Sequence, residues 1–499
     1  MVTRANYSGI GLVEQVQFWN GGRVDERWLP GPELAALLGE APLRPPRYAD
    51  LADRITRLII DGRVPAGARL TSERELAGEL GVSRTTVTEA YRKLVGTGVV
   101  RPRRGSGHWV RGRPRPATSD LLPVAGPDEQ GRIGLTVAAN PAPAALGPAV
   151  QRAAERLPRL AAGIGYFPDG LPELRAAIAD RYATRGLATR PEQILITPGS
   201  LAGLHVVART LRRGRRPFAV EAISHSASLR MLDQLASLAP FDMAAEGWGV
   251  ESLRQVLGRR RPVAVSLVPE FHNPTGRLMP EQTRVAIARV AAEAGVRLIA
   301  DETLVDLGFT GQAERPLAAY APDAVLVGSA SKSFWGGLRL GWIRSPDDLI
   351  DPLLRVRTLD DHGAAALEQL ILLELLAVED EVTAEHRPRN LARAEHLMGL
   401  LAARLPEWHW VAPEGGHTLW LELPAPRSTA LVAAARRQGV LLAAGPQFHA
   451  TGAGERWLRV PWTAEPHVLD TAIERLARAW SEVADTPGTP AAAAEPLSW

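Results

Sequence analysis

Apolar positions near the start of the chain recur at helical spacing over three short stretches that are separated by turns. The first stretch carries Leu51, Ile55, Leu58 and Ile59. Ser72 and Glu75 form a capping-box pattern, so a second helix is predicted to start there and to end before Gly81. Ser83 is a candidate N-cap for a third helix over residues 84–95. Two helices joined by a tight turn with glycine predict a helix-turn-helix.

A β-hairpin is predicted directly after the third helix. Two short apolar runs, residues 99–100 and 108–110, flank a basic loop over residues 101–107. Such a hairpin is suited to be the wing of a winged helix. The first folded part is therefore predicted to be an α+β winged helix-turn-helix domain, which we place at residues 44–111.

The pattern changes from Ile133 onward, where short apolar runs alternate with helical stretches. The strand-like runs are residues 194–197, 218–220, 263–268, 297–300 and 324–328, and helices are predicted over residues 172–184 and 280–293. This alternation predicts an α/β domain whose sheet has mixed or parallel strands. Further helices, with strands near residues 418–423 and 457–460, predict a smaller C-terminal lobe.

The two parts are separated by residues 112–132, which are rich in Pro, Gly and Arg and predict a linker. Its length would let the two domains of one chain contact different neighbours in a dimer. The other expected segments are an N-terminal extension over residues 1–43, to which no function is assigned, a large domain over residues 133–483, and a disordered tail over residues 484–499.

Charge is distributed unevenly along the 499 residues. Between Arg44 and Arg115 there are 16 basic and 7 acidic side chains, a net charge of +9, so the remainder carries −6 of the total of +3. This asymmetry predicts a polyanion partner for the first domain only, although such an excess can also be a solubilising surface.

Several classes of protein are excluded or disfavoured by what the chain lacks. The absence of cysteine excludes disulfides, thiolate metal sites and cysteine nucleophiles, and we expect no metal. We find no signal peptide and no uninterrupted apolar run of about 18 residues. We therefore expect a soluble cytoplasmic protein without a membrane partner.

Exposed polar residues of the winged helix are candidates for contact with duplex DNA. The start of the third helix would face base edges in the major groove, and it carries Ser83, Arg84, Thr85, Thr86 and Thr88. Phosphates could be neutralised by Arg74, Arg92, Lys93, Arg103 and Arg104. The alternative is a helix-turn-helix pattern that arises by chance.

Lys332 is the residue with the most specific chemistry in the second part. It and Lys93 are the only lysines in the chain. Arginine cannot act as an amine nucleophile, whereas a lysine with a lowered pKa can. Lys332 lies between two serines and ahead of a Gly-Leu-Arg sequence, so we interpret it as an amine that forms a Schiff base with an aldehyde cofactor. The alternative is an incidental surface lysine.

Pyridoxal 5′-phosphate (PLP) would need several further groups, and each has a candidate near a predicted strand end. Asp301 could keep the pyridinium nitrogen protonated, and Asn273 could donate to the phenolic oxygen. The turn over residues 197–201 opens a helix, so Ser200 and Leu201 could bind the phosphate. Ser329 and Arg339 could add a hydroxyl and a charged group, and His225 could stack on the ring. Taken singly, these residues could equally be a helix cap, an ordinary turn and a solvated histidine.

Two family resemblances support these interpretations. Residues 48–110, with Leu70-Thr-Ser-Glu-Arg-Glu-Leu-Ala, Leu80-Gly-Val-Ser-Arg-Thr-Thr-Val and Arg104-Gly-Ser-Gly-His-Trp-Val, resemble the winged helix of the GntR family. The family usually has Pro where Thr71 stands. The resemblance implies DNA contact by Arg74, Arg84, Thr85 and Thr86 and by the wing at Arg104 and Gly105.

Residues 133–482 resemble a fold-type I aminotransferase. The likeness rests on Asn273-Pro-Thr-Gly, Asp301 and Ser329-Ala-Ser-Lys with Arg339 seven residues after Lys332. It implies that Arg459, in Trp457-Leu-Arg-Val, binds the carboxylate of a substrate or effector. Three departures weaken the case for full turnover. Thr303 and Leu304 stand where a tyrosine is usual, the stacking aromatic is replaced within residues 221–225, and Tyr166 is shifted by one residue.

Both domains in this order resemble the MocR subfamily of GntR regulators, which usually form head-to-tail homodimers. The resemblance implies a DNA-binding transcription regulator that senses PLP, or an amino compound that reacts with PLP, through an aldimine on Lys332. Two alternatives are a working aminotransferase with an accessory DNA-binding domain and a regulator with a vestigial cofactor site.

Overall fold

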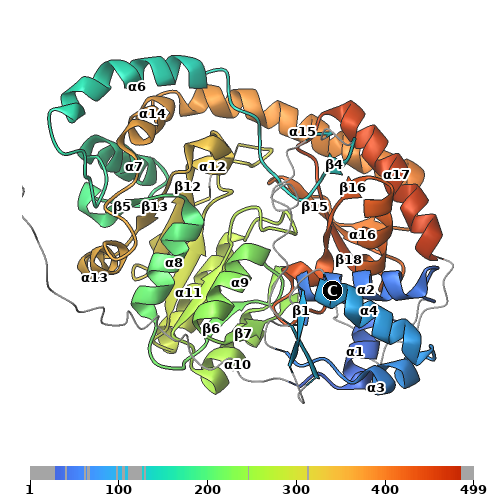
Figure 1. Cartoon of the computed structure of the whole chain (residues 1–499). Helices are drawn as coiled ribbons and strands as arrows, with labels where there is room; N and C mark the ends of the chain where they lie inside the picture. The colour runs from blue at the N-terminus through green and yellow to red at the C-terminus, as the bar shows by residue number, and fades with distance from the viewer. Residues whose placement is uncertain are drawn as a thin grey trace, which may run out of the picture. The chain divides into compact units, whose positions relative to one another are not determined.

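Figure 1 shows the computed structural model of the chain. The structure describes residues 28–39, 42–60, 63–64, 68–96, 99–103, 107–110, 126–127, 131–244, 247–311 and 314–484. The chain divides into two compact units, within residues 1–115 and 116–499. Of the predicted tail, only Ala484 is described, as the last residue of α17 (Pro466–Ala484).

The N-terminal unit is a winged helix-turn-helix, as predicted. Its helices are α1 (Gly31–Leu38), α2 (Arg47–Ile60), α3 (Glu73–Glu79) and α4 (Arg84–Gly96). The wing strands β1 (Val100–Arg103) and β2 (Gly107–Val110) pair antiparallel, with Val100 opposite Val110. Ser72 caps α3 by accepting a hydrogen bond from the Glu75 amide at 3.2 Å. The apolar side chains at helical spacing form one core, which includes Leu51, Ile55, Leu76, Val87, Tyr91 and Leu94.

The C-terminal unit is built on a seven-stranded sheet in the order β5-β13-β12-β11-β10-β6-β7. Six of these strands run parallel, and β13 (Gly341–Arg344) runs antiparallel to both of its neighbours. The parallel strands are β5 (Ile194–Thr197), β6 (Phe218–Glu221), β7 (Leu238–Phe241), β10 (Ala264–Leu267), β11 (Arg297–Asp301) and β12 (Val325–Ser329). The mixed α/β sheet that the alternating pattern predicted is therefore confirmed.

Both faces of this sheet are buried, so its strands are mostly apolar and lack a regular alternation of apolar and polar residues. Along β11, Ile299 packs on one face with helices α8 (Ser200–Leu211), α9 (Ser226–Leu235) and α13 (Asp347–Arg357). Its neighbours Leu298 and Ala300 pack on the other face with α7 (Pro172–Thr184), α11 (Glu281–Glu293) and α14 (Ala366–Leu376). Figure 1 shows helices α8 and α9 beside the strands of the large sheet.

A second, smaller lobe follows the large sheet, as expected. Its four-stranded antiparallel sheet has the order β14-β15-β18-β17 and is made by β14 (His409–Trp410), β15 (Thr418–Glu422), β17 (Ala443–Ala444) and β18 (Trp457–Pro461). Helices α15 (Glu379–Arg404), α16 (Ser428–Arg437) and α17 pack on it around Leu397, Leu421, Leu458 and Leu476.

One segment of the predicted linker has regular structure. β3 (Gly126–Pro127) pairs antiparallel with β4 (Ile133–Gly134), which in turn pairs with β16 (Val440–Leu441) of the small lobe. Residues 112–125 and 128–130 lie outside the described part of the chain. The C-terminal end of the predicted linker therefore leads directly into the small lobe.

Candidate functional site

The carboxyl ends of the six parallel strands, β5, β6, β7, β10, β11 and β12, lie at one edge of the large sheet. β13 begins at this edge and runs in the opposite direction. Its first residue, Gly341, pairs with Ser329 on one side and with Thr197 on the other. Asp301 ends β11 at the same edge, one strand further along. The topology therefore brings together residues that are more than one hundred positions apart in the sequence, and ligands bind at this kind of edge in α/β folds.

Lys332 lies at this edge on α12 (Ala330–Ser333), a single helical turn. The hydroxyl of Ser329 caps the turn by accepting a hydrogen bond from the Ser331 amide at 3.1 Å. The Nζ of Lys332 donates to the carbonyl oxygen of Ala138 at 2.6 Å. The lysine therefore points toward the chain that follows β4 and not toward bulk solvent.

The amine of Lys332 is easier to deprotonate than that of an ordinary lysine. Burial, assisted by the positive charges of Arg459 and Arg339, lowers the pKa of Lys332 to about 8, while Asp301 acts in the opposite direction. Only the neutral amine is nucleophilic. With this pKa, roughly a tenth of the side chains carry a neutral amine at pH 7, against about one in three thousand for an unperturbed lysine.

The turn over residues 197–201 has the form of an anion site. Gly199 has φ 94° and precedes α8, whose first residue is Ser200, so the backbone amides at this helix start are exposed to the site edge. A Cβ at Gly199 would lie 3.3 Å from Nη2 of Arg339, which places this guanidinium against the turn. Leu201 is the next residue of α8 and is 39% exposed.

Asp301 and Asn273 lie where sequence reasoning placed them, at the ends of β11 and beyond β10. Burial raises the pKa of Asp301, and the hydrogen bond that the Thr303 amide donates to its Oδ1 at 2.9 Å counteracts this effect. The Oδ1 atom of Asn273 and the Oγ1 atom of Thr303 are buried without a hydrogen-bond partner in the described structure. Such unpaired buried atoms are costly unless a ligand satisfies them.

His225 is the N-cap residue of α9, and its Nδ1 lies 2.9 Å from the hydroxyl of Ser228. Burial, with the positive charges of Arg459, Lys332 and Arg230, lowers the pKa of His225 to about 3. The ring is therefore neutral at physiological pH. Since Lys332 and Arg459 both contribute to this effect, His225 belongs to the same cluster of side chains as the candidate amine.

Arg459 on β18 is buried, and its guanidinium donates a hydrogen bond to a backbone carbonyl. Its Nη2 donates to the carbonyl oxygen of Thr136, its guanidinium lies 4.6 Å from the centre of the Phe448 ring, and its Nε has no partner among the described residues. Burial lowers the pKa of Arg459 to about 10. A buried guanidinium that faces a carbonyl is well suited to take a carboxylate.

Sequence reasoning missed two groups of residues around the lysine. His417 is buried, neither of its ring nitrogens has a hydrogen-bond partner among the described residues, and burial together with Lys332 holds its pKa well below the usual range. Its position directly after Gly415-Gly416 was the only signal in the sequence. Ser333 donates to Asp306, which also pairs with Arg181, so this chain of contacts fixes the helical turn of Lys332.

In the N-terminal unit, the predicted base-reading residues lie at the start of α4. Arg74, Ser83, Arg84 and Thr85 are exposed, and the Ser83 hydroxyl caps the helix at the Thr86 amide. Thr88 instead donates to Glu73 on α3 at 2.8 Å, so its hydroxyl is already engaged.

The candidate phosphate contacts differ in how far they are already neutralised. Arg92 pairs with Glu89 at 2.6 Å and Lys93 pairs with Asp53 at 2.9 Å. Arg84 lies 3.9 Å from Glu73 but remains largely exposed. Arg104 and Gly105, which were also predicted to contact DNA, and the side chain of Arg103 lie outside the described residues. Of the described candidates, Arg92 and Lys93 are therefore more fully paired with acidic side chains than Arg74 and Arg84.

The fold and the site define a winged-helix DNA-binding domain fused to a domain with the fold-type I aminotransferase architecture. Residues 133–476 match the family model of aminotransferase class I and II, and residues 47–110 match that of the bacterial regulatory proteins of the gntR family. The chain belongs to the aminotransferase class I and II family and carries a GntR domain, the combination found in MocR-type regulators.

Several named proteins are similar to the chain over most of their length. The chain is 27% identical to the probable rhizopine catabolism regulatory protein MocR of Rhizobium meliloti, over 73% of this chain and 78% of the relative. It is 30% identical to the pyridoxine biosynthesis regulator PdxR of Corynebacterium glutamicum, over 66% and 72% of the two chains. Among solved structures, LysN, the α-aminoadipate aminotransferase of Thermus thermophilus complexed with N-(5′-phosphopyridoxyl)-L-leucine, superposes with a TM-score of 0.65 at 26% identity, over 70% of this chain and 92% of LysN.

Among the helices that the structure describes, none has both the length and the apolar character needed to cross a bilayer.

Proposed function

We propose that this chain is a PLP-binding transcription regulator in which Lys332 reports the presence of PLP, or of an amino compound that reacts with it, to the winged helix. The observation that carries the proposal is the combination, in one chain, of a winged helix with a buried lysine whose pKa is lowered to about 8. The MocR and PdxR relatives, both named as regulators, support the regulatory output over a purely enzymatic one.

The residues at the sheet edge fit PLP. The helix start at Ser200 and the guanidinium of Arg339 would hold a phosphate, because backbone N–H groups and a guanidinium both donate hydrogen bonds to phosphate oxygens. The buried Oγ1 of Thr303 lacks a partner, so a polar group of the ring could satisfy it, and the side-chain amide of Asn273 could donate to the phenolic oxygen. When bound, PLP supplies an aldehyde for an amine and an electron-withdrawing ring.

The side chains of the protein would do the remaining work. Lys332 supplies the neutral amine, and Asp301 would hold a proton on the ring nitrogen of the cofactor. A ring nitrogen that carries positive charge would in turn favour the ionised carboxylate of Asp301. The neutral ring of His225 could cover one face of the cofactor, and Arg459 would bind the carboxylate of an amino-acid effector.

We also propose a homodimer and domain boundaries at 44–111 and 133–483, with α1 packed on the core of the first domain. Two adjacent segments, joined by the stack of Tyr166 on His362 at 5.4 Å, expose large side chains: Ile164 is 86% and Leu359 is 76% exposed. Exposed apolar patches of this kind mark interaction sites. Leu359→Glu is expected to lower the mass of the particle by half in sedimentation or light scattering, and an unchanged mass would reject this patch as the dimer contact.

A second candidate function is a working aminotransferase. The presence of Lys332, Asp301 and Arg459 at one edge favours it, and so does the likeness to LysN. The absence of a tyrosine near Asp301 counts against it, because Thr303 and Leu304 stand there. Sustained exchange of amino groups between an amino acid and a keto acid by the purified chain would favour this alternative.

Absorption spectroscopy tests the proposed function directly. The purified chain with PLP is expected to show a visible band that Lys332→Ala lacks. Lys93→Ala is the matched control because Lys93 is the only other lysine, and it should retain the band. A wild-type chain without a band would contradict the proposal.

Independently, Arg84→Ala is expected to weaken specific DNA binding by about 1–3 kcal/mol if Arg84 reads a base.

A further inference from the structure

Two loops at the opposite edge of the large sheet from Lys332 are unusually basic. One leads from α8 into β6 and the other leads from α10 (Val250–Arg260) into β10, so both lie at the amino ends of strands. Residues 212–216 and 259–261 together contain seven arginines, and residues 211–220 and 255–263 contain no acidic residue. All seven arginine side chains are exposed. We call this set of seven residues the arginine edge.

The arginine edge is not neutralised by the protein itself. Among the described residues, none of its guanidiniums pairs with a carboxylate, whereas nearby Arg209 and Arg254 each pair with an acidic residue at 2.6 Å. Arg216 instead joins the two loops by donating to the carbonyl oxygens of Arg261 at 2.8 Å and Pro262 at 2.9 Å. The loops are therefore held beside each other while their charges stay available.

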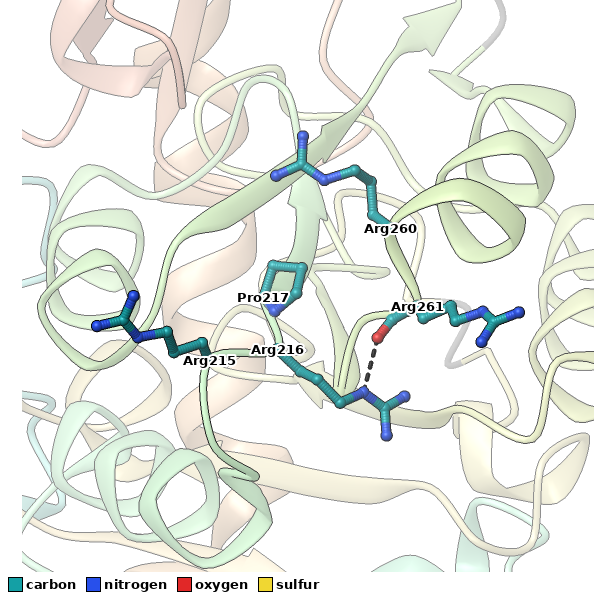
Figure 2. A pocket seen from close by; sticks show the side chains of 5 residues that line it. All are labelled: Arg215, Arg216, Pro217, Arg260 and Arg261. Carbon is teal, nitrogen blue, oxygen red and sulfur yellow. Dashed lines mark hydrogen bonds between the residues drawn. The ribbon is translucent and has the colours of Figure 1, made fainter.

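The arrangement suits an extended anion and not a small one. Figure 2 shows the open hollow that both loops line, with the guanidiniums of Arg215, Arg260 and Arg261 pointing in different directions and not converging on one point. A single phosphate ion would therefore meet few donors at once. Duplex DNA carries one negative charge per about 1.7 Å of its axis, so it can meet separated cations simultaneously.

We propose that the arginine edge is a second DNA-binding surface, which contacts backbone phosphates of the duplex outside the segment bound by the winged helix. This inference rests on the proposed function, because the winged helix brings DNA to the same chain at a high effective concentration. The residues outside 44–115 carry a net −6 although the arginine edge contributes +7, so all their other charges sum to −13. This acidity would repel DNA from other faces and favour one orientation.

The salt dependence of DNA binding tests the proposal. The test variant replaces Arg212, Arg215, Arg259 and Arg260 by Gln, and it spares Arg216 because that residue joins the loops. The control variant replaces four exposed arginines elsewhere on the same unit by Gln: Arg159, Arg289, Arg355 and Arg404. On a 60-base-pair duplex of mixed sequence, the slope of log affinity against log salt should become shallower by about 2 to 4 in the test variant, at about 0.9 per phosphate contact. The control should keep the wild-type slope.

Cross-linking gives a second readout that is independent of net charge. The chain has no cysteine, so Arg215→Cys creates a unique site for a photoactivatable cross-linker, and Arg404→Cys is its control. We expect cross-linking to the 60-base-pair duplex from position 215 and none from position 404.

The outcomes separate failure of this inference from failure of the proposed function. If the wild-type chain binds the duplex but both variants share its slope, the second surface is rejected and the winged-helix site stands. If the wild-type chain binds no duplex, both fail. Loss of tripolyphosphate binding or of anionic-vesicle binding in the test variant, with an unchanged DNA slope, would assign the edge to another anion and overturn the proposal.

Discussion

Gly341 is predicted to control the affinity for PLP although it has no side chain that could contact the cofactor. A Cβ added at Gly341 would lie 2.6 Å from the carbonyl carbon of Gly199 and 2.7 Å from the amide nitrogen of Ser200. Ordinary Cβ contacts begin near 3.4 Å, so Gly341→Ala must move the turn at Gly199 by roughly 0.8 Å. An amide–phosphate hydrogen bond of about 2.9 Å would then stretch to about 3.7 Å and be lost.

One lost hydrogen bond to a charged group corresponds to about 1.5–3 kcal/mol, or roughly a 10- to 150-fold higher Kd for PLP. Titration with PLP, followed by visible absorption, measures this Kd, and thermal unfolding without PLP measures the separate cost of overpacking, about 1–3 kcal/mol. Gly399→Ala on α15 is the control, because a Cβ there meets no atom within 4 Å. A folded Gly341→Ala chain with the wild-type Kd would refute the assignment of this turn to the phosphate.

Three further predictions follow from the site and its surroundings. Because the neutral amine of Lys332 reacts, stopped-flow measurements should show PLP capture accelerating about tenfold per pH unit below pH 8 and levelling off above it; a flat profile would contradict the lowered pKa. Arg459→Leu should weaken the response to amino acids but not to amines that lack a carboxylate, and equal losses for both would reject a carboxylate-binding role. Arg284→Met should destabilise the fold by about 3–5 kcal/mol in urea unfolding, because it removes the hydrogen-bonded partner of buried Glu270 at 2.8 Å and leaves only Arg185 at 3.9 Å, and Glu270→Gln in the same chain should recover part of the loss. Burial raises the pKa of Glu270, so this loss should shrink as the pH falls and the carboxyl group takes up a proton; a loss that grows with acidity would refute the argument.

The sequence was most informative where residue type and local pattern agree. Helical spacing predicted the buried residues Leu51, Ile55 and Leu58 because one face of the helix has to be apolar in so small a domain. The rarity of lysine singled out Lys332 because this chain otherwise uses arginine for positive charge. Strand-like runs predicted β5 and β11 because strands that are buried on both faces are apolar without interruption.

Contacts made by the backbone could not be predicted in the same way. The carbonyl of Ala138 accepts from Lys332 across 194 positions, and any residue type has such a carbonyl. β13 was not predicted because its four residues include Gly341 and Arg344, and the antiparallel direction of this strand depends on the tertiary fold. The arginine edge was missed because its two runs, residues 212–216 and 259–261, are separated by more than forty positions. Acidic residues between them lower the net charge of the segment as a whole, so neither run stood out.

Between β4 and Asn140, backbone carbonyls bind two of the cations of the site, since Thr136 accepts from Arg459 and Ala138 accepts from Lys332. A carboxylate at Arg459, or a bond from PLP to the Lys332 amine, would compete with these carbonyls. This stretch follows directly on the predicted linker to the winged helix. Ligand binding and release of the stretch would then be thermodynamically linked, and linkage is reciprocal: DNA that favours the released state would raise the affinity for the ligand by the same factor.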